Sequence, residues 1–87
     1  MTRRVEFPAG FDRLFRRLPK GVRPKAYGNL ALFLEDPSHP SLRVKRMRGT
    51  AAIWEMSVTM NYRITFEVEG ERVLLRRIGT HDVLREP

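Results

Sequence analysis

The second half of the chain places apolar residues at every second position, which is the period of a β-strand with one buried face. The apolar members of this pattern are Trp54, Met56, Val58, Tyr62, Ile64, Phe66 and Val68. A tight connection at Asn61 separates two such strands, and Glu69-Gly70-Glu71 follows the second as a hairpin turn. The segment from Val73 to Ile78 has apolar residues of both parities, so we expect this strand to lie more centrally in the sheet.

The first half of the chain has the period of helices. After Pro8, which a first helical turn tolerates, apolar residues follow at i, i+3, i+4 and i+7: Phe11, Leu14, Phe15 and Leu18. Pro19 and Gly21 end this helix, and a second helix is expected from residue 22 or 23 to residue 35. Because the connection is short, the two helices are expected to form an antiparallel hairpin.

These patterns predict one α+β domain over residues 1–87. A chain of this length buries about 60–65 % of the surface of its unfolded state on folding, so its core is small. A short N-terminal strand at residues 3–7 and the helical hairpin precede a three- to four-stranded antiparallel sheet, whose first strand starts at Ser41 and ends before the loop at Gly49-Thr50. The helices are expected to cover the apolar face. The opposite face, with Lys45 beside it, is expected to be polar, basic and uncovered.

The chain of 87 residues has a formal net charge of +7, and 14 of its 17 basic residues are arginine. This charge favours a polyanionic partner. A membrane surface is disfavoured, because the sequence has no basic amphipathic helix with an exposed apolar face. The absence of cysteine excludes disulfides, zinc–thiolate sites and thiol catalysis. No apolar run follows Met1-Thr2-Arg3-Arg4, so we expect no signal peptide and a cytoplasmic location.

No phosphate-cradling glycine loop, nucleophile elbow or histidine pair at metal-ligand spacing is present, so neither a metal nor a cofactor is expected. A metal-independent reaction needs a substrate that carries its own nucleophile. RNA does so through its 2′-hydroxyl, which DNA lacks. Such a site needs a base near the hydroxyl, a cation near the phosphorane and an acid near the leaving 5′-oxygen.

Two residues fit these roles. His81 ends the last strand, and histidine is the residue type that moves protons near neutral pH. Arg63 lies on the polar face of its strand, where it can bind an anion. We expect them to meet on the uncovered face. Each also has a structural interpretation: a solvated loop histidine for His81, and for Arg63 an ion pair, with Glu55 as the favoured partner. His39 is interpreted as a turn residue.

Several short motifs, in this order and spacing, resemble the toxins of the RelE/ParE superfamily, from bacterial type II toxin–antitoxin pairs. They are His39-Pro40-Ser41-Leu42, Arg48-Gly49, Ile53-Trp54-Glu55-Met56-Ser57-Val58, Asn61-Tyr62-Arg63-Ile64 and Ile78-Gly79-Thr80-His81-Asp82-Val83-Leu84. The resemblance implies a β-α-α-β-β-β microbial-ribonuclease-like fold and a ribosome-dependent endoribonuclease that cuts mRNA in the A site. It also implies an antitoxin that wraps the toxin, with operator DNA bound only through that complex.

Matched residue by residue, Arg63 corresponds to the family arginine that contacts the scissile phosphate, and His81 to the C-terminal histidine of the YafQ and YoeB branches, a general acid or base. Lys45 lies in the basic region of RelE-like toxins, and either Lys45 or His81 would have to act as the general base. The remaining candidates, for substrate binding, are Arg43, Arg46, Arg48 and Arg76.

Two alternatives remain open. A ParE-like toxin would inhibit DNA gyrase by binding, although such relatives generally lack the histidine after Gly79-Thr80. An inactive relative would serve only as part of a DNA-binding co-repressor.

Overall fold

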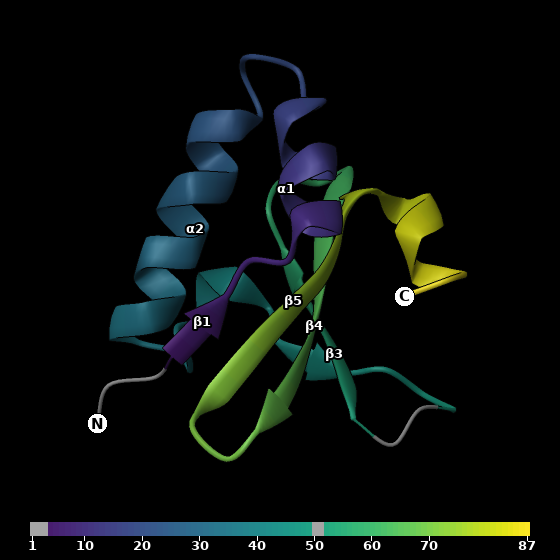
Figure 1. Ribbon diagram of the computed structural model, residues 1–87. Coiled ribbons are helices and arrows are strands. Elements are labelled where there is room, and N and C mark those ends of the chain that lie inside the picture. The colour runs from purple at the N-terminus through teal and green to yellow at the C-terminus, as the bar shows by residue number, and fades with distance from the viewer. Residues whose placement is uncertain (1–3, 50–51) are drawn as a thin grey trace.

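The computed structural model describes residues 4–49 and 52–87, so the expected strand residue Arg3 and the loop residue Thr50 lie outside the described part. The elements in chain order are β1 (Arg4–Glu6), α1 (Ala9–Arg16), α2 (Arg23–Glu35), the 3-10 helix η1 (Pro40–Leu42), β2 (Lys45–Arg46), β3 (Ile53–Ser57), β4 (Tyr62–Glu69), β5 (Arg72–Thr80) and the 3-10 helix η2 (His81–Leu84). Figure 1 shows α1 and α2 as a helical hairpin beside the sheet. The α+β architecture expected from the sequence is confirmed. No helix in the described ranges has both the length and the apolar character needed to cross a bilayer.

The sheet has five strands in the order β1-β5-β4-β3-β2, more than the three or four expected. The fifth strand is β1, the short N-terminal strand expected from the sequence, which joins the sheet by pairing with β5 in parallel, Val5 opposite Val73, whereas the other neighbours are antiparallel. β5 therefore lies between two strands, which agrees with its apolar residues of both parities.

The segment expected to form a strand from Ser41 onward is mostly not a strand, and β2 has only two residues. Pro40 begins η1, and the backbone of Arg43 lies in the left-handed region with φ 49°. A non-glycine residue in that region turns the chain away from an extended path. The pairing of β2 with β3 consequently begins only at Lys45, opposite Glu55.

The core lies between the helices and the apolar face of the sheet. Phe33 of α2 packs edge-on against Phe66 of β4, with ring centroids 5.1 Å apart. The Asn29 side chain donates hydrogen bonds to the carbonyl oxygens of Ser57 (2.8 Å) and Val58 (3.4 Å), so it fixes α2 to the end of β3. α1 ends at Arg16, earlier than Pro19, and packs against β5.

An ion pair supports the attachment of β1. The guanidinium Nε of Arg72 donates to Glu6 Oε2 at 2.6 Å across the parallel pair. This hydrogen bond, and then the charge of Arg72, lower the pKa of the Glu6 carboxyl below its ordinary value, and Glu6 in turn raises the pKa of Arg72.

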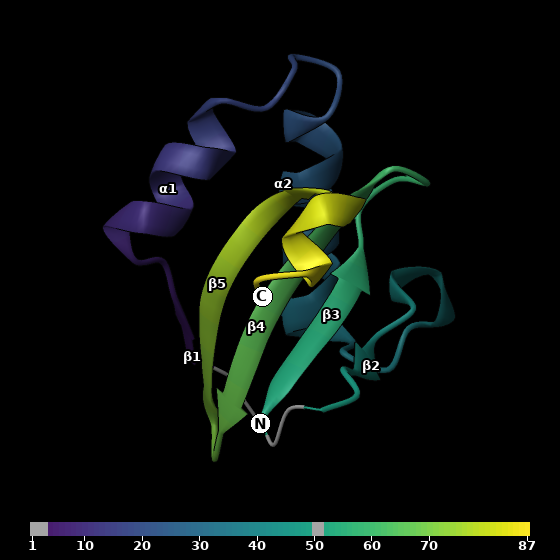
Figure 2. The ribbon, with the colours of Figure 1, turned by 90° about the vertical axis from the view of Figure 1, so that its right-hand side faces the viewer.

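The middle of the polar face of the sheet is covered, whereas we expected the whole face to be open. Figure 2 shows the last residues of the chain running in front of β4, on the side opposite α2, and η2 contacts both β4 and β5. Thr65, on this face, is fully buried, and its hydroxyl donates to the backbone oxygen of Pro87 at 3.1 Å. We call residues 81–87 the C-terminal strap.

The contact of the strap with β5 depends on a glycine. A Cβ at Gly79 would lie 2.8 Å from Cγ1 of Val83, which is closer than real side chains approach. Val83 is buried, so its side chain occupies the space above the Gly79 backbone. Gly79 therefore permits the close approach of the strap to β5.

Candidate functional site

His81 is the first residue of η2, directly after β5 ends at Thr80. It is exposed and borders an open hollow of about 520 Å³ that is also lined by Asn61, Tyr62, Thr80 and Asp82. The hollow thus combines the β3–β4 turn with the start of the strap. A nucleotide can reach the imidazole there, which is the first requirement for proton transfer.

Arg63 has a different environment. Its Nη1 donates to the carbonyl oxygens of Thr59 (2.6 Å), Met60 (3.1 Å) and Tyr62 (3.0 Å). Its Nε lies 4.0 Å from Oε1 of Glu55, and only 14 % of the side chain is exposed. The guanidinium therefore holds the β3–β4 turn in shape, and Glu55 is the ion-pair partner that the sequence favoured.

Arg63 and His81 come to the same end of the sheet but not to the same hollow. Arg63 pairs across β4 and β5 with Gly79, whereas the hollow of His81 is lined by the next pair, Tyr62 and Thr80. Arg63 is not among the residues that line this hollow, and its guanidinium is engaged by the carbonyl oxygens of the β3–β4 turn and by Glu55. The expected meeting of the two side chains on one open face stays a prediction.

Lys45 belongs to a row of cross-strand partners on the polar face. The row runs from Lys45 through Glu55 and Thr65 to Arg77. Glu55 and Thr65 in its middle are buried, whereas Lys45 at the β2 edge is exposed. The neighbouring basic candidates are exposed along the same edge region: Arg43, Arg46 and Arg48.

Arg76 is the extra residue of a β-bulge, because Thr65 pairs with Arg77 and Phe66 with Leu75. Its Nε donates to the backbone oxygen of Pro87 (3.0 Å), and its Nη1 to Glu67 Oε1 (2.6 Å). The structure thus places this substrate-binding candidate as an anchor of the strap.

The sequence analysis missed the strap itself. The available signal was Val83, an apolar residue four positions after a glycine, near the end of a charged segment. Within residues 4–49 and 52–87, no three acidic or histidine side chains converge in a way that would hold a metal ion.

Comparison with protein-family models gives no match, and comparison with curated proteins gives none either. Solved structures do match. The RelB–RelE antitoxin–toxin complex from Methanococcus jannaschii contains a chain with TM-score 0.75 and 20% identity, over 92% of this chain and 94% of that one. A chain of the E. coli DinJ–YafQ toxin–antitoxin complex matches with TM-score 0.79 and 13% identity, over 97% and 98%.

A double arginine-to-alanine mutant of the E. coli toxin RelE in the free state matches with TM-score 0.73 and 20% identity, over 99% of this chain and 93% of that chain. These matches extend over nearly the whole length of both partners. The fold expected from the sequence resemblance is confirmed, and the chain has the fold of the RelE and YafQ toxins.

Proposed function

We propose that the chain is the toxin of a type II toxin–antitoxin pair and acts as a ribosome-dependent endoribonuclease in the cytoplasm. It cuts mRNA in the A site by attack of the 2′-hydroxyl, without a metal. The observation that supports this proposal is the fold, shared over nearly the full length with the RelE and YafQ toxins. Its partners are a cognate antitoxin, the ribosome and mRNA, and it contacts operator DNA only through the antitoxin complex.

His81 is the proton-transfer group in this proposal. It is exposed in an open hollow, and an imidazole can accept a proton from the 2′-hydroxyl or donate one to the leaving 5′-oxygen near neutral pH. Lys45 is the other candidate base, and the exposed residues Arg43, Arg46 and Arg48 bind the mRNA backbone.

Arg63 acts in two ways in this proposal. Through Nη1 it fixes the turn that carries Asn61 and Tyr62, so it sets the rim of the His81 hollow. A guanidinium has five N–H donors, so those not on Nη1 can contact a phosphate oxygen.

The test compares the two histidines of the chain. Purified protein is added to translating ribosomes, and cleavage of the mRNA is mapped for wild type, His81→Ala and His39→Ala. His39 is a matched control because its Nδ1 contacts the Ser41 hydroxyl at 2.8 Å in η1, away from the hollow. We expect His81→Ala to lose about 10²–10⁴-fold in cleavage rate and His39→Ala to retain it.

Two further conditions test the chemistry. A single 2′-deoxy substitution at the scissile nucleotide should abolish cleavage, because the nucleophile is removed. Chelation of free metal, at a concentration that leaves the ribosome intact, should not change it. Equal cleavage by both histidine variants, or cleavage at the 2′-deoxy site, would refute the proposed mechanism.

A toxin that inhibits DNA gyrase by binding is the second candidate. The observation that favours it is the engagement of Arg63 with turn carbonyls and Glu55, which leaves the His81 hollow without this cation. A supercoiling assay decides between the two. Inhibition of gyrase together with intact mRNA on the ribosome would establish the binding toxin and exclude the nuclease.

A further inference from the structure

Several side chains around the His81 hollow have polar groups without a partner in the protein. Besides His81, the hollow of about 520 Å³ is lined by Asn61, Tyr62, Thr80 and Asp82. In the described part of the chain, the side chains of Asn61, His81 and Asp82 form no hydrogen bond and no ion pair. A volume in the range of about 300–1,000 Å³ with a few convergent polar groups is typical of a small-ligand site. Proton transfer by His81 uses only one of these three groups.

Asp82 is the lining residue that phosphate binding does not explain. It directly follows His81 in η2, and it is exposed. Although the net charge of the chain is +7, Asp82 pairs with no basic residue of the described ranges, and it makes no hydrogen bond to the imidazole of His81. A carboxylate repels a phosphate but accepts strong hydrogen bonds. The part of an RNA chain that suits it is therefore the edge of a base, where N–H groups lie on an uncharged ring.

The four RNA bases differ in how their edges meet a carboxylate. An ionised carboxylate only accepts hydrogen bonds, through two oxygens side by side. The pairing edge of guanine has two neighbouring donors, the N1–H and the N2 amino group. Adenine, cytosine and uracil each have an acceptor beside the donor on that edge, and this acceptor would face the second carboxylate oxygen. Asp82 therefore favours guanine over the other three bases.

Asn61 can bind the remaining group of the guanine edge. Its side-chain amide donates hydrogen bonds, and O6 of guanine accepts them. The backbone that carries Asn61 is already fixed, because its N–H donates to Oγ1 of Thr59 at 3.2 Å. Arg63 holds the same turn through the carbonyl oxygens of Thr59 and Met60. A binding group on a preorganised backbone loses little entropy when the ligand binds.

Tyr62 adds an aromatic side chain to the lining of the hollow. It is half-buried and packs against the core, so its position is restrained. Proteins that recognise single-stranded RNA stack an unpaired base on an aromatic side chain and bind its edge by hydrogen bonds. The hollow thus has an aromatic residue, a carboxylate and an amide beside one imidazole.

We propose that the His81 hollow recognises a guanine next to the scissile bond, with Asp82 accepting hydrogen bonds from N1–H and the N2 amino group and Asn61 donating to O6. The substrate, mRNA, rests on the proposed function, whereas the choice of base rests on the lining of the hollow. Asp82 is then a specificity-determining residue, and His81 remains the proton-transfer group.

The test changes one atom of Asp82 and measures a ratio of two cleavage rates. Purified protein is added to translating ribosomes with mRNAs that have guanine or adenine on either side of the scissile bond. Wild type should cleave the guanine mRNA at least about fivefold faster, the discrimination of one bidentate base contact. Asp82→Asn should reverse the preference, because an amide presents an acceptor and a donor that match the N6 amino group and N1 of adenine. Asp82→Ala should bring the ratio close to one.

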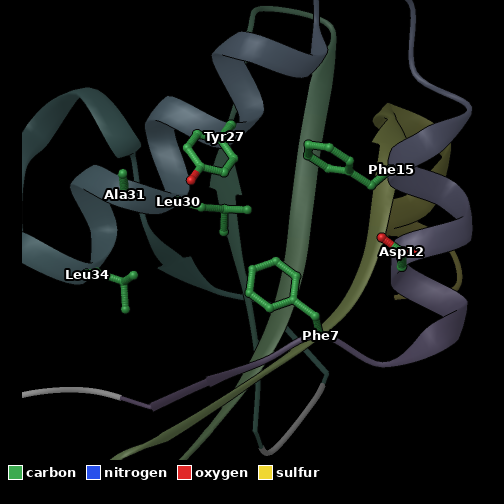
Figure 3. A pocket seen from close by; sticks show the side chains of 7 residues that line it. All are labelled: Phe7, Asp12, Phe15, Tyr27, Leu30, Ala31 and Leu34. Atoms are coloured by element: carbon green, nitrogen blue, oxygen red, sulfur yellow. The ribbon is translucent and has the colours of Figure 1, made fainter.

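Asp12→Asn is the matched control, since it makes the same change of side chain and charge at another place. Figure 3 shows Asp12 on α1, in the groove that faces α2, and it is not among the residues that line the His81 hollow. Its ratio should equal that of wild type. A loss of folded protein lowers both rates equally, so it leaves the ratio unchanged. An unaltered ratio in Asp82→Asn, or an equal change in Asp12→Asn, would overturn the inference.

Binding to RNA that cannot be cleaved separates this inference from the proposed function. Short single-stranded oligonucleotides with one 2′-deoxyguanosine or one 2′-deoxyadenosine among uridines are titrated with the protein, and binding is followed by fluorescence anisotropy. A guanine preference that Asp82→Asn reverses would support the base site even if mRNA on the ribosome stayed intact, which would refute the nuclease. Cleavage of mRNA with no base preference in either assay would overturn the base site and leave the nuclease standing.

Discussion

Replacing Gly79 with alanine should destabilise the protein through a single contact. The new Cβ would lie 2.8 Å from Cγ1 of Val83. Valine has a stiff χ1 and is buried here, so it cannot swing away. Such overpacking costs about 1–3 kcal/mol, and the lower chain entropy of alanine in the unfolded state offsets about 0.4–1 kcal/mol of it.

A second substitution, at Val83 in the strap, should relieve the overpacking caused by alanine at position 79. Val83→Ala removes both methyl groups, Cγ1 and Cγ2, at a cost of about 1.6 kcal/mol in lost apolar burial. In the double variant the methyl group of residue 79 fills part of the space that Cγ1 leaves. We therefore expect the double variant to be more stable than the sum of the single effects predicts, by about 1–3 kcal/mol.

The assay is urea unfolding of the four proteins, followed by far-UV circular dichroism and by Trp54 fluorescence. Coincident transitions from the two probes establish that unfolding is two-state. Single effects that add to within about 0.5 kcal/mol would show that residues 79 and 83 do not touch in solution, and would refute the close approach.

Three further substitutions test other contacts. Thr65→Val keeps the shape but removes the acceptor of the Arg77 N–H and one of the two donors to the Pro87 oxygen, so urea unfolding should show a loss of about 1–3 kcal/mol; an unchanged midpoint would contradict the buried bond. Arg63→Lys should accelerate amide exchange at residues 59–62 while exchange in the core strands stays unchanged, because an ammonium cannot hold three carbonyls as a guanidinium does. Glu6→Gln should remove stability at neutral pH but not in acid.

The direction of the last effect follows from the pKa of Glu6. Because the hydrogen bond from Arg72 lowers the pKa of Glu6 in the folded state, its stabilisation is complete above the ordinary carboxyl pKa of 4.5. It is lost as the pH falls through the folded value. Unfolding of wild type and Glu6→Gln should therefore differ at neutral pH and converge in acid; a constant difference across that range would contradict the linkage.

The helices and the main strands could be predicted because their signals are local. The i, i+3, i+4 spacing of Phe11 and its neighbours, and the alternation from Trp54 to Val68, each reflect contacts with one opposing surface. The prediction of a strand directly after Pro40 was wrong, because Arg43 adopts a left-handed backbone conformation that interrupts the two-residue period. The residue type arginine does not indicate that conformation.

The candidate site was predicted less completely, since its geometry depends on distant parts of the chain. The choice between phosphate and Glu55 as the partner of Arg63 depends on the path of the β3–β4 turn, which the sequence does not specify. Thr65 is buried because the strap covers it, and its hydrogen-bond partner Pro87 is 22 residues away in the sequence. The roles of His81 and Lys45 remain predictions.

The parallel pairing of β1 with β5 has a consequence for synthesis. Arg4 and its partner Arg72 are 68 residues apart, and α1 also packs on the same late strand. While the ribosome is still translating the middle of the message, β1 and α1 cannot pack, because β5 has not yet been synthesised. The protein acquires its edge strand and helical cover only after most of the chain has emerged, so nascent fragments that end before β5 cannot assume this architecture.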